Sequence, residues 1–119
     1  MIIGVHHAQV NVPSDKLAEA RDFYIGVLGI KEIHRPDVFT SKGIWLNAGP
    51  FELHIGVEDN LERKTRAHLA YQVTDIAKWR DRLERAGVTI TDSVAIPGLE
   101  RFEFRDPFGN RVELIQPVG

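Results

Sequence analysis

The chain has no cysteine among its 119 residues, and it lacks both long apolar runs and a strong excess of either charge. Without cysteine there can be no disulfide, thiol nucleophile or thiolate metal ligand. A formal net charge of −2 gives no electrostatic basis for binding nucleic acid or an anionic membrane. No apolar run approaches the roughly 20 residues that span a bilayer, and the first residues do not resemble a signal peptide. We therefore expect a cytoplasmic protein with neither a nucleic-acid nor a membrane partner.

The composition is that of a chain that can build its own core. Hydrophobic residues make up 43% of the sequence and charged residues 27%. A chain of this length fits one compact domain. We expect residues 1–119 to form that single domain.

Two histidine–glutamate pairs recur at a constant distance along the chain. His68 and Glu113 lie 61 positions after His7 and Glu52, so each half has a His followed 45 positions later by a Glu. A repeat of about this size indicates one structural unit used twice. Two His and two Glu at equivalent places predict that the units bring four ligands to one metal ion.

Each half predicts a strand, a helix and three further strands. In the first half the strands lie near 2–12, 30–35, 38–47 and 50–57. Ser14 or Asp15 can cap the helix between the first two, and Gly29 can end it. In the second half the strands lie near 66–74, 88–96, 99–106 and 110–116. There, Thr74 or Asp75 begins the helix and Gly87 ends it.

Alternation along the strands separates a polar face from an apolar one. Glu52 and His54 share one face of their strand, whereas Leu53 and Ile55 take the other. Helices can cover the apolar face. A sheet of this kind can curl around a polar cavity, into which the His and Glu side chains would point.

Four segments resemble the vicinal oxygen chelate superfamily, which includes glyoxalase I, methylmalonyl-CoA epimerase, extradiol dioxygenases, fosfomycin-resistance enzymes and bleomycin-binding proteins. They are Val5–Val12, Asp22–Gly29, Phe51–His54 and Asp106–Leu114. The resemblance implies an α+β fold of two βαβββ modules that form a cup-shaped mixed sheet with helices on the outer face. Module 1 would cover about residues 1–60 and module 2 about 61–119. It also implies a homodimer.

By the same resemblance, His7, Glu52, His68 and Glu113 would be the metal ligands, a set similar to that of glyoxalase I. Imidazole and carboxylate donors suit Ni²⁺, Co²⁺, Mn²⁺, Fe²⁺ or Zn²⁺. The implied reaction is lyase or isomerase chemistry, in which a proton beside a carbonyl is abstracted from a small-molecule substrate. Glu113 or Glu52 would take that proton.

Further residues are expected on the polar face without a fixed role. The candidates for substrate contact are Gln9, Asn11, His54, Gln72 and Arg101. Gln9 and Asn11 could equally bond to each other, His54 could orient a ligand, and Arg101 could hold a substrate anion or form a structural ion pair. Trp45 and Trp79 are interpreted as packing residues.

Two alternative functions stay open. An Fe²⁺ extradiol-type dioxygenase would use His7, His68 and Glu113 and would leave Glu52 without a role. A metal-free protein that binds or sequesters a small molecule, such as an antibiotic, would need none of these ligands. Oxygen uptake distinguishes the first alternative from a lyase, and metal content distinguishes the second.

Overall fold

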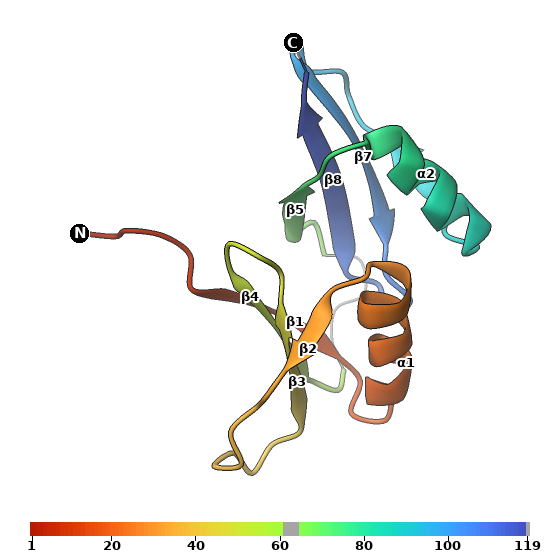
Figure 1. The fold of residues 1–119 in the computed structure, drawn as a ribbon. Helices are drawn as coiled ribbons and strands as arrows, with labels where there is room; N and C mark the ends of the chain where they lie inside the picture. Colours follow the sequence, from red (N-terminus) through yellow and green to blue (C-terminus); the bar gives the residue numbers. More distant parts are fainter. Residues whose placement is uncertain (61–64, 119) are drawn as a thin grey trace. The chain divides into compact units, whose positions relative to one another are not determined.

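The structure, a computed structural model, describes residues 1–60 and 65–118. The chain divides into two compact units, Met1–Glu62 and Arg63–Gly119. Each unit contains a four-stranded mixed sheet and a helical segment (Figure 1), so the predicted α+β fold of two βαβββ modules is confirmed. The connection at 61–64 lies outside the described residues, and the expectation that both units form one domain stays a prediction.

The first unit follows the predicted order of strand, helix and three strands. Its elements are β1 (His7–Val12), α1 (Leu17–Arg21), η1 (Asp22–Val27), β2 (Lys31–Ile33), β3 (Gly43–Asn47) and β4 (Glu52–Val57). The strand order in the sheet is β1-β4-β3-β2. β1 runs parallel to β4, and the other two pairings are antiparallel. The strand that carries His7 therefore lies at an edge of its sheet, beside the strand that carries Glu52.

The helical segment of the first unit starts later than the sequence predicted. Its N-cap residue is Lys16 rather than Ser14 or Asp15. Ser14 instead bonds through its backbone N–H and its hydroxyl to the carboxylate of Asp59, at 3.0–3.1 Å. Because this side chain is engaged with Asp59, two residues after β4, it does not cap the helix. Gly29, with φ of +74°, ends the segment as expected.

The second half of this helical segment is wound as a π-helix. The N–H of Leu28 donates to the carbonyl of Phe23, five residues earlier, at 3.0 Å. The wider turn places both Phe23 and Tyr24 in the core, where they are at most 5% exposed. π turns of this kind are uncommon and often lie at functional sites.

The second unit repeats the topology. Its elements are β5 (His68–Gln72), α2 (Ile76–Arg85), β6 (Ile90–Asp92), β7 (Leu99–Arg105) and β8 (Arg111–Pro117). The strand order is β5-β8-β7-β6, with β5 parallel to β8. The helix begins after Asp75, one of the two expected N-cap residues, and the chain leaves it at Gly87, where φ is +83°.

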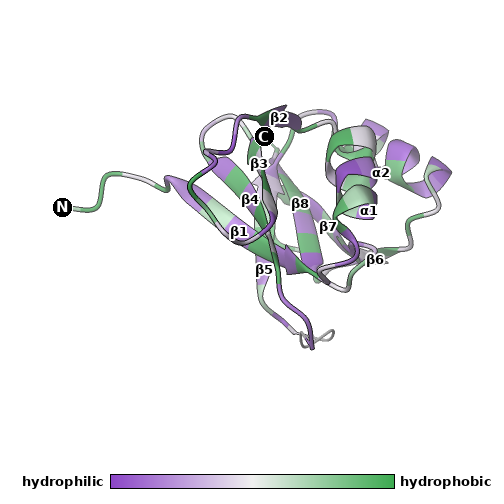
Figure 2. Ribbon diagram, turned by 90° about the horizontal axis from the view of Figure 1, so that it is seen from below, coloured by the Kyte–Doolittle hydropathy of each residue, from purple (hydrophilic) through white to green (hydrophobic). Residues whose placement is uncertain are grey.

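In both units the apolar residues of the sheet face the helical segment. Figure 2 shows hydrophobic and hydrophilic residues alternating along β4 and β8. Leu53 and Ile55 of β4 are buried, as are Val112 and Leu114 of β8. Burying one face of each strand fixes its register, because a slip of one residue would turn every side chain over. The other face of each sheet is left for polar groups.

Several predicted strands are shorter in the structure, and the largest differences are at β1, β3 and β6. β1 begins at His7 rather than near residue 2, because its partner β4 begins at Glu52, directly opposite His7. β3 begins at Gly43 rather than near residue 38, and β6 ends at Asp92 rather than near residue 96. Hydrophobic alternation alone cannot show where a partner strand stops.

The turn between β7 and β8 is organised by one buried carboxylate. Asp106 is 4% exposed. Its carboxylate accepts hydrogen bonds from the backbone N–H groups of Phe108 and Asn110 and from the Asn110 side-chain amide, at 2.8–2.9 Å. These bonds fix the direction in which β8 leaves the turn toward Glu113.

Across the residues that the structure describes, no helix has the length and apolar character needed to cross a membrane.

Candidate functional site

The polar face of the first unit brings the predicted His7 and Glu52 together. The two residues are direct partners in the β1–β4 register. In a strand pair, partners that lie directly opposite each other project to the same face of the sheet. His54, two residues along β4, projects to this face as well. We call the sheet face that carries His7, Glu52 and His54 the polar face of unit 1.

Glu52 is held by an imidazole from its own strand. His54 Nε2 lies 3.0 Å from Glu52 Oε1, so the ring donates its N–H to the carboxylate. This hydrogen bond holds the pKa of Glu52 below its ordinary value, and the nearby His6 and His7 rings add a smaller electrostatic contribution. Glu52 is consequently favoured as a carboxylate, the form in which it can bind a cation.

Three rings stack across the polar face of unit 1. His54 lies between His7 and Trp45, with 4.2 Å between ring centroids on each side. The ring planes differ by 14° for His7 and by 3° for Trp45. Trp45, interpreted from the sequence as a packing residue, thus stacks on the polar face and not in the core that the helix covers. Only the β3–β4 register, which pairs Trp45 with His54, identifies this role.

A pocket of about 490 Å³ adjoins Glu52 within unit 1. Its wall is mixed, with polar side chains from three residues beside the apolar ones. The lining residues are Val5, His6, Ile33, Asn47, Gly49, Pro50, Phe51 and Glu52. This pocket could not be predicted from the sequence, because its residues come from separate segments: the chain before β1, strands β2 and β3, the turn before β4, and the start of β4.

Gln9 and Asn11 lie on the same face and bond to each other. Gln9 Nε2 donates to Asn11 Oδ1, and Asn11 Nδ2 donates to Glu58 Oε1, both at 2.8 Å. Gly56 lies opposite Asn11 in β4, and a Cβ at this glycine would meet both amide side chains. The absence of a side chain at position 56 therefore makes room for this row of hydrogen bonds.

The polar face of unit 2 carries the other predicted pair. His68 Nε2 lies 3.2 Å from Glu113 Oε1. Glu113 is 6% exposed, whereas His68 is exposed. The register differs from that of unit 1, because Glu113 pairs with Ala70 and His68 pairs with Arg111. The two side chains thus meet diagonally across β5 and β8.

Arg101 lies beside Glu113 on this face. Arg101 Nη1 lies 3.6 Å from Glu113 Oε1, and its Nη2 donates to the carbonyl of Val94 at 2.8 Å. On the neighbouring positions, Arg111 forms an ion pair with Glu103. Both Arg101 and Glu113 are largely buried, so their charges compensate each other in a poorly solvated place. Gln72 ends β5 on the same face and is exposed.

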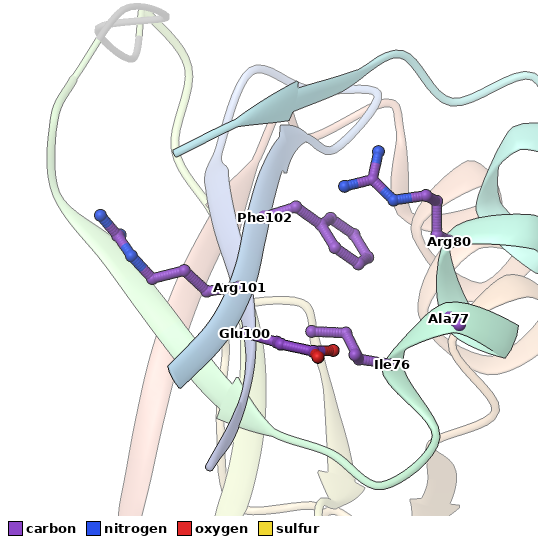
Figure 3. Close-up of a pocket in the computed structure, with 6 residues that line it drawn as sticks. All are labelled: Ile76, Ala77, Arg80, Glu100, Arg101 and Phe102. Atoms are coloured by element: carbon purple, nitrogen blue, oxygen red, sulfur yellow. The ribbon is translucent and has the colours of Figure 1, made fainter. Parts of the chain in front are cut away.

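The opposite face of unit 2 has a smaller hollow of about 290 Å³ between α2 and β7 (Figure 3). Ile76, Ala77 and Arg80 line it from α2, and Glu100, Arg101 and Phe102 from β7. Figure 3 shows the Arg101 side chain leaving β7 on the side away from Phe102, as alternation requires. This hollow is therefore separated by the sheet from His68 and Glu113.

Neither unit by itself gathers a metal site from three or more His, Cys, Asp or Glu side chains, over residues 1–60 and 65–118. Each unit supplies one His and one Glu of the predicted set to its own polar face. The substrate-contact candidates Gln9, Asn11 and His54 lie on the polar face of unit 1. Gln72 and Arg101 lie on that of unit 2.

Comparison with known proteins identifies relatives over nearly the whole chain. A family model described as Glyoxalase/Bleomycin resistance protein/Dioxygenase superfamily matches residues 4–114. A glyoxalase family protein from Bacillus anthracis is 38% identical, with a TM-score of 0.91, over 98% of this chain and 97% of that one. A superfamily member from Sphaerobacter thermophilus is 25% identical, with a TM-score of 0.78, over 98% of both chains. No curated protein matches.

A more distant similarity concerns fosfomycin resistance. A variant of the fosfomycin resistance protein FosX from Listeria monocytogenes, complexed with Mn(II) and 1S,2S-dihydroxypropylphosphonic acid, is 21% identical, with a TM-score of 0.83. The alignment covers all of this chain and 94% of the Listeria chain. At this identity the likeness concerns the fold alone.

Proposed function

The chain belongs to the glyoxalase/bleomycin resistance protein/dioxygenase superfamily, and from this membership we propose that it is a metal-dependent enzyme acting on a small molecule. The proposed reaction is lyase or isomerase chemistry like that of glyoxalase I, with abstraction of a proton beside a carbonyl. One observation carries the proposal: each unit presents a histidine and a glutamate on the polar face of its sheet, from its first and fourth strands. We also propose that the protein is a cytoplasmic homodimer.

The side chains that are present fit a divalent metal ion. In unit 2 the Glu113 and His68 donor atoms are 3.2 Å apart. That separation is compatible with both atoms binding one ion at about 2.0–2.2 Å. In unit 1 the hydrogen bond from His54 keeps Glu52 ionised beside His7. Imidazole and carboxylate donors without thiolate suit Ni²⁺, Co²⁺, Mn²⁺, Fe²⁺ and Zn²⁺.

We assign His7, Glu52, His68 and Glu113 as the ligands. When bound, the metal would act as a Lewis acid that stabilises negative charge on a substrate oxygen. Glu113 is our first candidate for the proton acceptor, because it is buried and therefore shielded from competing water. Glu52, with a side chain one-third exposed, is the second candidate.

The substrate is proposed to lie against the polar faces. The pocket beside Glu52 has an apolar wall from Val5, Ile33 and Phe51, which suits a small apolar group. Arg101 could pair with a substrate carboxylate or phosphate through the part of its guanidinium that Glu113 and Val94 leave free. The remaining proposed contacts are Gln9, Asn11, His54 and Gln72.

The first test is metal content of the untagged protein by mass spectrometry. We expect about one transition metal ion per chain, lost in His7→Ala and retained in the matched control His34→Ala, because His34 is exposed outside the polar face. Protein without bound metal is then incubated with Mn²⁺, Ni²⁺, Co²⁺, Fe²⁺ and Zn²⁺, and its metal content is measured again. Protein that takes up none of these ions would contradict the proposal and favour the metal-free binding protein.

Replacing the proton acceptor tests the chemistry. Glu113→Gln should lower turnover by at least about 100-fold, the contribution typical of a general base, while most of the metal stays bound. The control Glu100→Gln changes an exposed glutamate on the opposite face of β7 and should keep full activity. Full activity of Glu113→Gln would remove Glu113 from the mechanism. Oxygen uptake during turnover would indicate the dioxygenase instead.

A further inference from the structure

The ring that contacts both candidate ligands of unit 1 is itself buried. His54 is 7% exposed, although it lies on the polar face. Its two ring faces are covered, one by His7 and the other by Trp45, each with a centroid separation of 4.2 Å. A ring held between two parallel neighbours cannot tilt without losing both contacts. The plane of His54 is therefore fixed by the stack.

The rotation of His54 within its plane is fixed by a different contact. Its Nε2–H donates to Glu52 Oε1 at 3.0 Å. A carboxylate with one oxygen engaged by a fixed donor keeps the other oxygen directed away from that donor. The same ring thus orients Glu52 at its edge and His7 on its face.

Trp45 is supported in turn by the loop that precedes β3. The Phe39 ring lies 5.8 Å from Trp45, and the guanidinium carbon of Arg35 lies 4.6 Å from the centre of Phe39. The row of rings therefore runs from His7 through His54 and Trp45 to Phe39, and the Arg35 guanidinium lies over the last ring. Aromatic and cation–π contacts of this kind favour one ring geometry over others.

We propose that His54, backed by Trp45, is a positioning residue that sets the directions of the His7 imidazole and the Glu52 carboxylate for metal binding. The inference rests on the proposed function. It gives His54 a role other than substrate contact. Residues that orient metal ligands typically contribute 10–100-fold to metal affinity.

The experiment measures Co²⁺ affinity and the visible absorption of bound Co²⁺ for the full-length protein and its variants. His54→Gln keeps an amide that can donate to Glu52 but loses the stacked ring, and Trp45→Leu removes the backing ring alone. We expect each to weaken Co²⁺ binding by about 10–100-fold and to change the Co²⁺ spectrum. Trp45→Phe, which keeps an aromatic ring, should restore most of the affinity.

Trp79→Phe is the matched control, because Trp79 lies on α2 of unit 2 and is not part of the row of rings in unit 1. It should leave both the affinity and the spectrum unchanged. Circular dichroism of each variant checks that the chain is folded, and the Trp45→Phe variant keeps the test decisive if Trp45→Leu does not fold.

The outcomes separate this inference from the proposed function. Wild-type affinity and spectrum in both His54→Gln and Trp45→Leu would overturn the positioning role alone. Loss of binding in His54→Gln with no change in Trp45→Leu would also overturn it, because His54 would then be a ligand. Wild-type protein that binds no Co²⁺, nor any other ion offered, would overturn the proposed function and this inference together.

Discussion

At the scale of single residues, the pairs His7–Glu52 and His68–Glu113 could be found from the sequence because they repeat at one distance. The role of Trp45 in the ring stack could not be found from the sequence. A tryptophan in a predicted strand is usually a core residue, and alternation gives its face only when the register to the next strand is known. Here the pairing with His54 puts it on the polar face. The sequence predicted donor groups better than it predicted the rings that hold them.

Tyr71 provides a prediction about alkaline pH. Burial raises its pKa above the ordinary value of 10.0, and the negative charge of Asp106 raises it further. Above pH 10 the unfolded chain loses the phenol proton while the folded protein keeps it, so stability falls as pH rises; below pH 10 there is no such loss. The slope due to Tyr71 is at most about 1.4 kcal/mol per pH unit.

Urea unfolding of wild type and Tyr71→Phe between pH 8 and pH 11 measures this effect. The wild type should lose stability more steeply than Tyr71→Phe above about pH 10, and the two curves should run parallel below it. Curves that stay parallel over the whole range would show that Tyr71 ionises as easily in the folded protein as in the unfolded chain.

At the scale of elements, topology was more predictable than boundaries. The order of one strand, one helix and three strands in each half followed from periodicity and glycine positions, and the structure confirms it. The ends of β1, β3 and β6 were wrong because a strand stops where its partner stops. The predicted helix cap at Ser14 or Asp15 was wrong, and α1 begins at Leu17, because Ser14 bonds to Asp59, 45 positions away, and no local pattern reveals that contact.

The β7–β8 turn provides a prediction at this scale. Asp106→Ala removes three hydrogen bonds to a buried carboxylate and leaves two backbone N–H groups without that acceptor. The expected loss is about 2–4 kcal/mol in the free energy of unfolding, measured in urea. Asp92→Ala, which breaks one exposed ion pair with Arg80, should cost less than about 1 kcal/mol. Equal losses in the two variants would contradict the role given to Asp106.

At the scale of the whole molecule, the proposed homodimer agrees with two features of the separate units. β1 and β5 each lie at an edge of their own sheet, where one side of the backbone has no strand of that sheet as partner. Large apolar side chains are also exposed, among them Ile2, Ile3 and Val38. Edge strands and exposed apolar groups are both features that association can cover.

Light scattering coupled to size exclusion tests this state directly. We expect a mass of twice the 13.5 kDa of one chain. That mass should persist as the protein is diluted to low micromolar concentration, because an interface of ordinary size supports affinity of this order. A mass of 13.5 kDa throughout would contradict the dimer.

The His-to-Glu spacing is equal in the two units, although the segments that make it up differ in length. The glycines that end the helical segments, Gly29 and Gly87, are 58 positions apart, whereas the histidines and the glutamates are each 61 apart. Between its histidine and its glycine, unit 1 therefore has three more residues than unit 2, and this longer segment contains the π turn. Between its glycine and its glutamate, unit 2 has three more residues than unit 1. The two length differences are equal and opposite, so they cancel by the fourth strand of each unit. The β1–β4 and β5–β8 registers nevertheless differ by two residues, so an equal spacing along the chain does not give the two pairs the same placement across their strands.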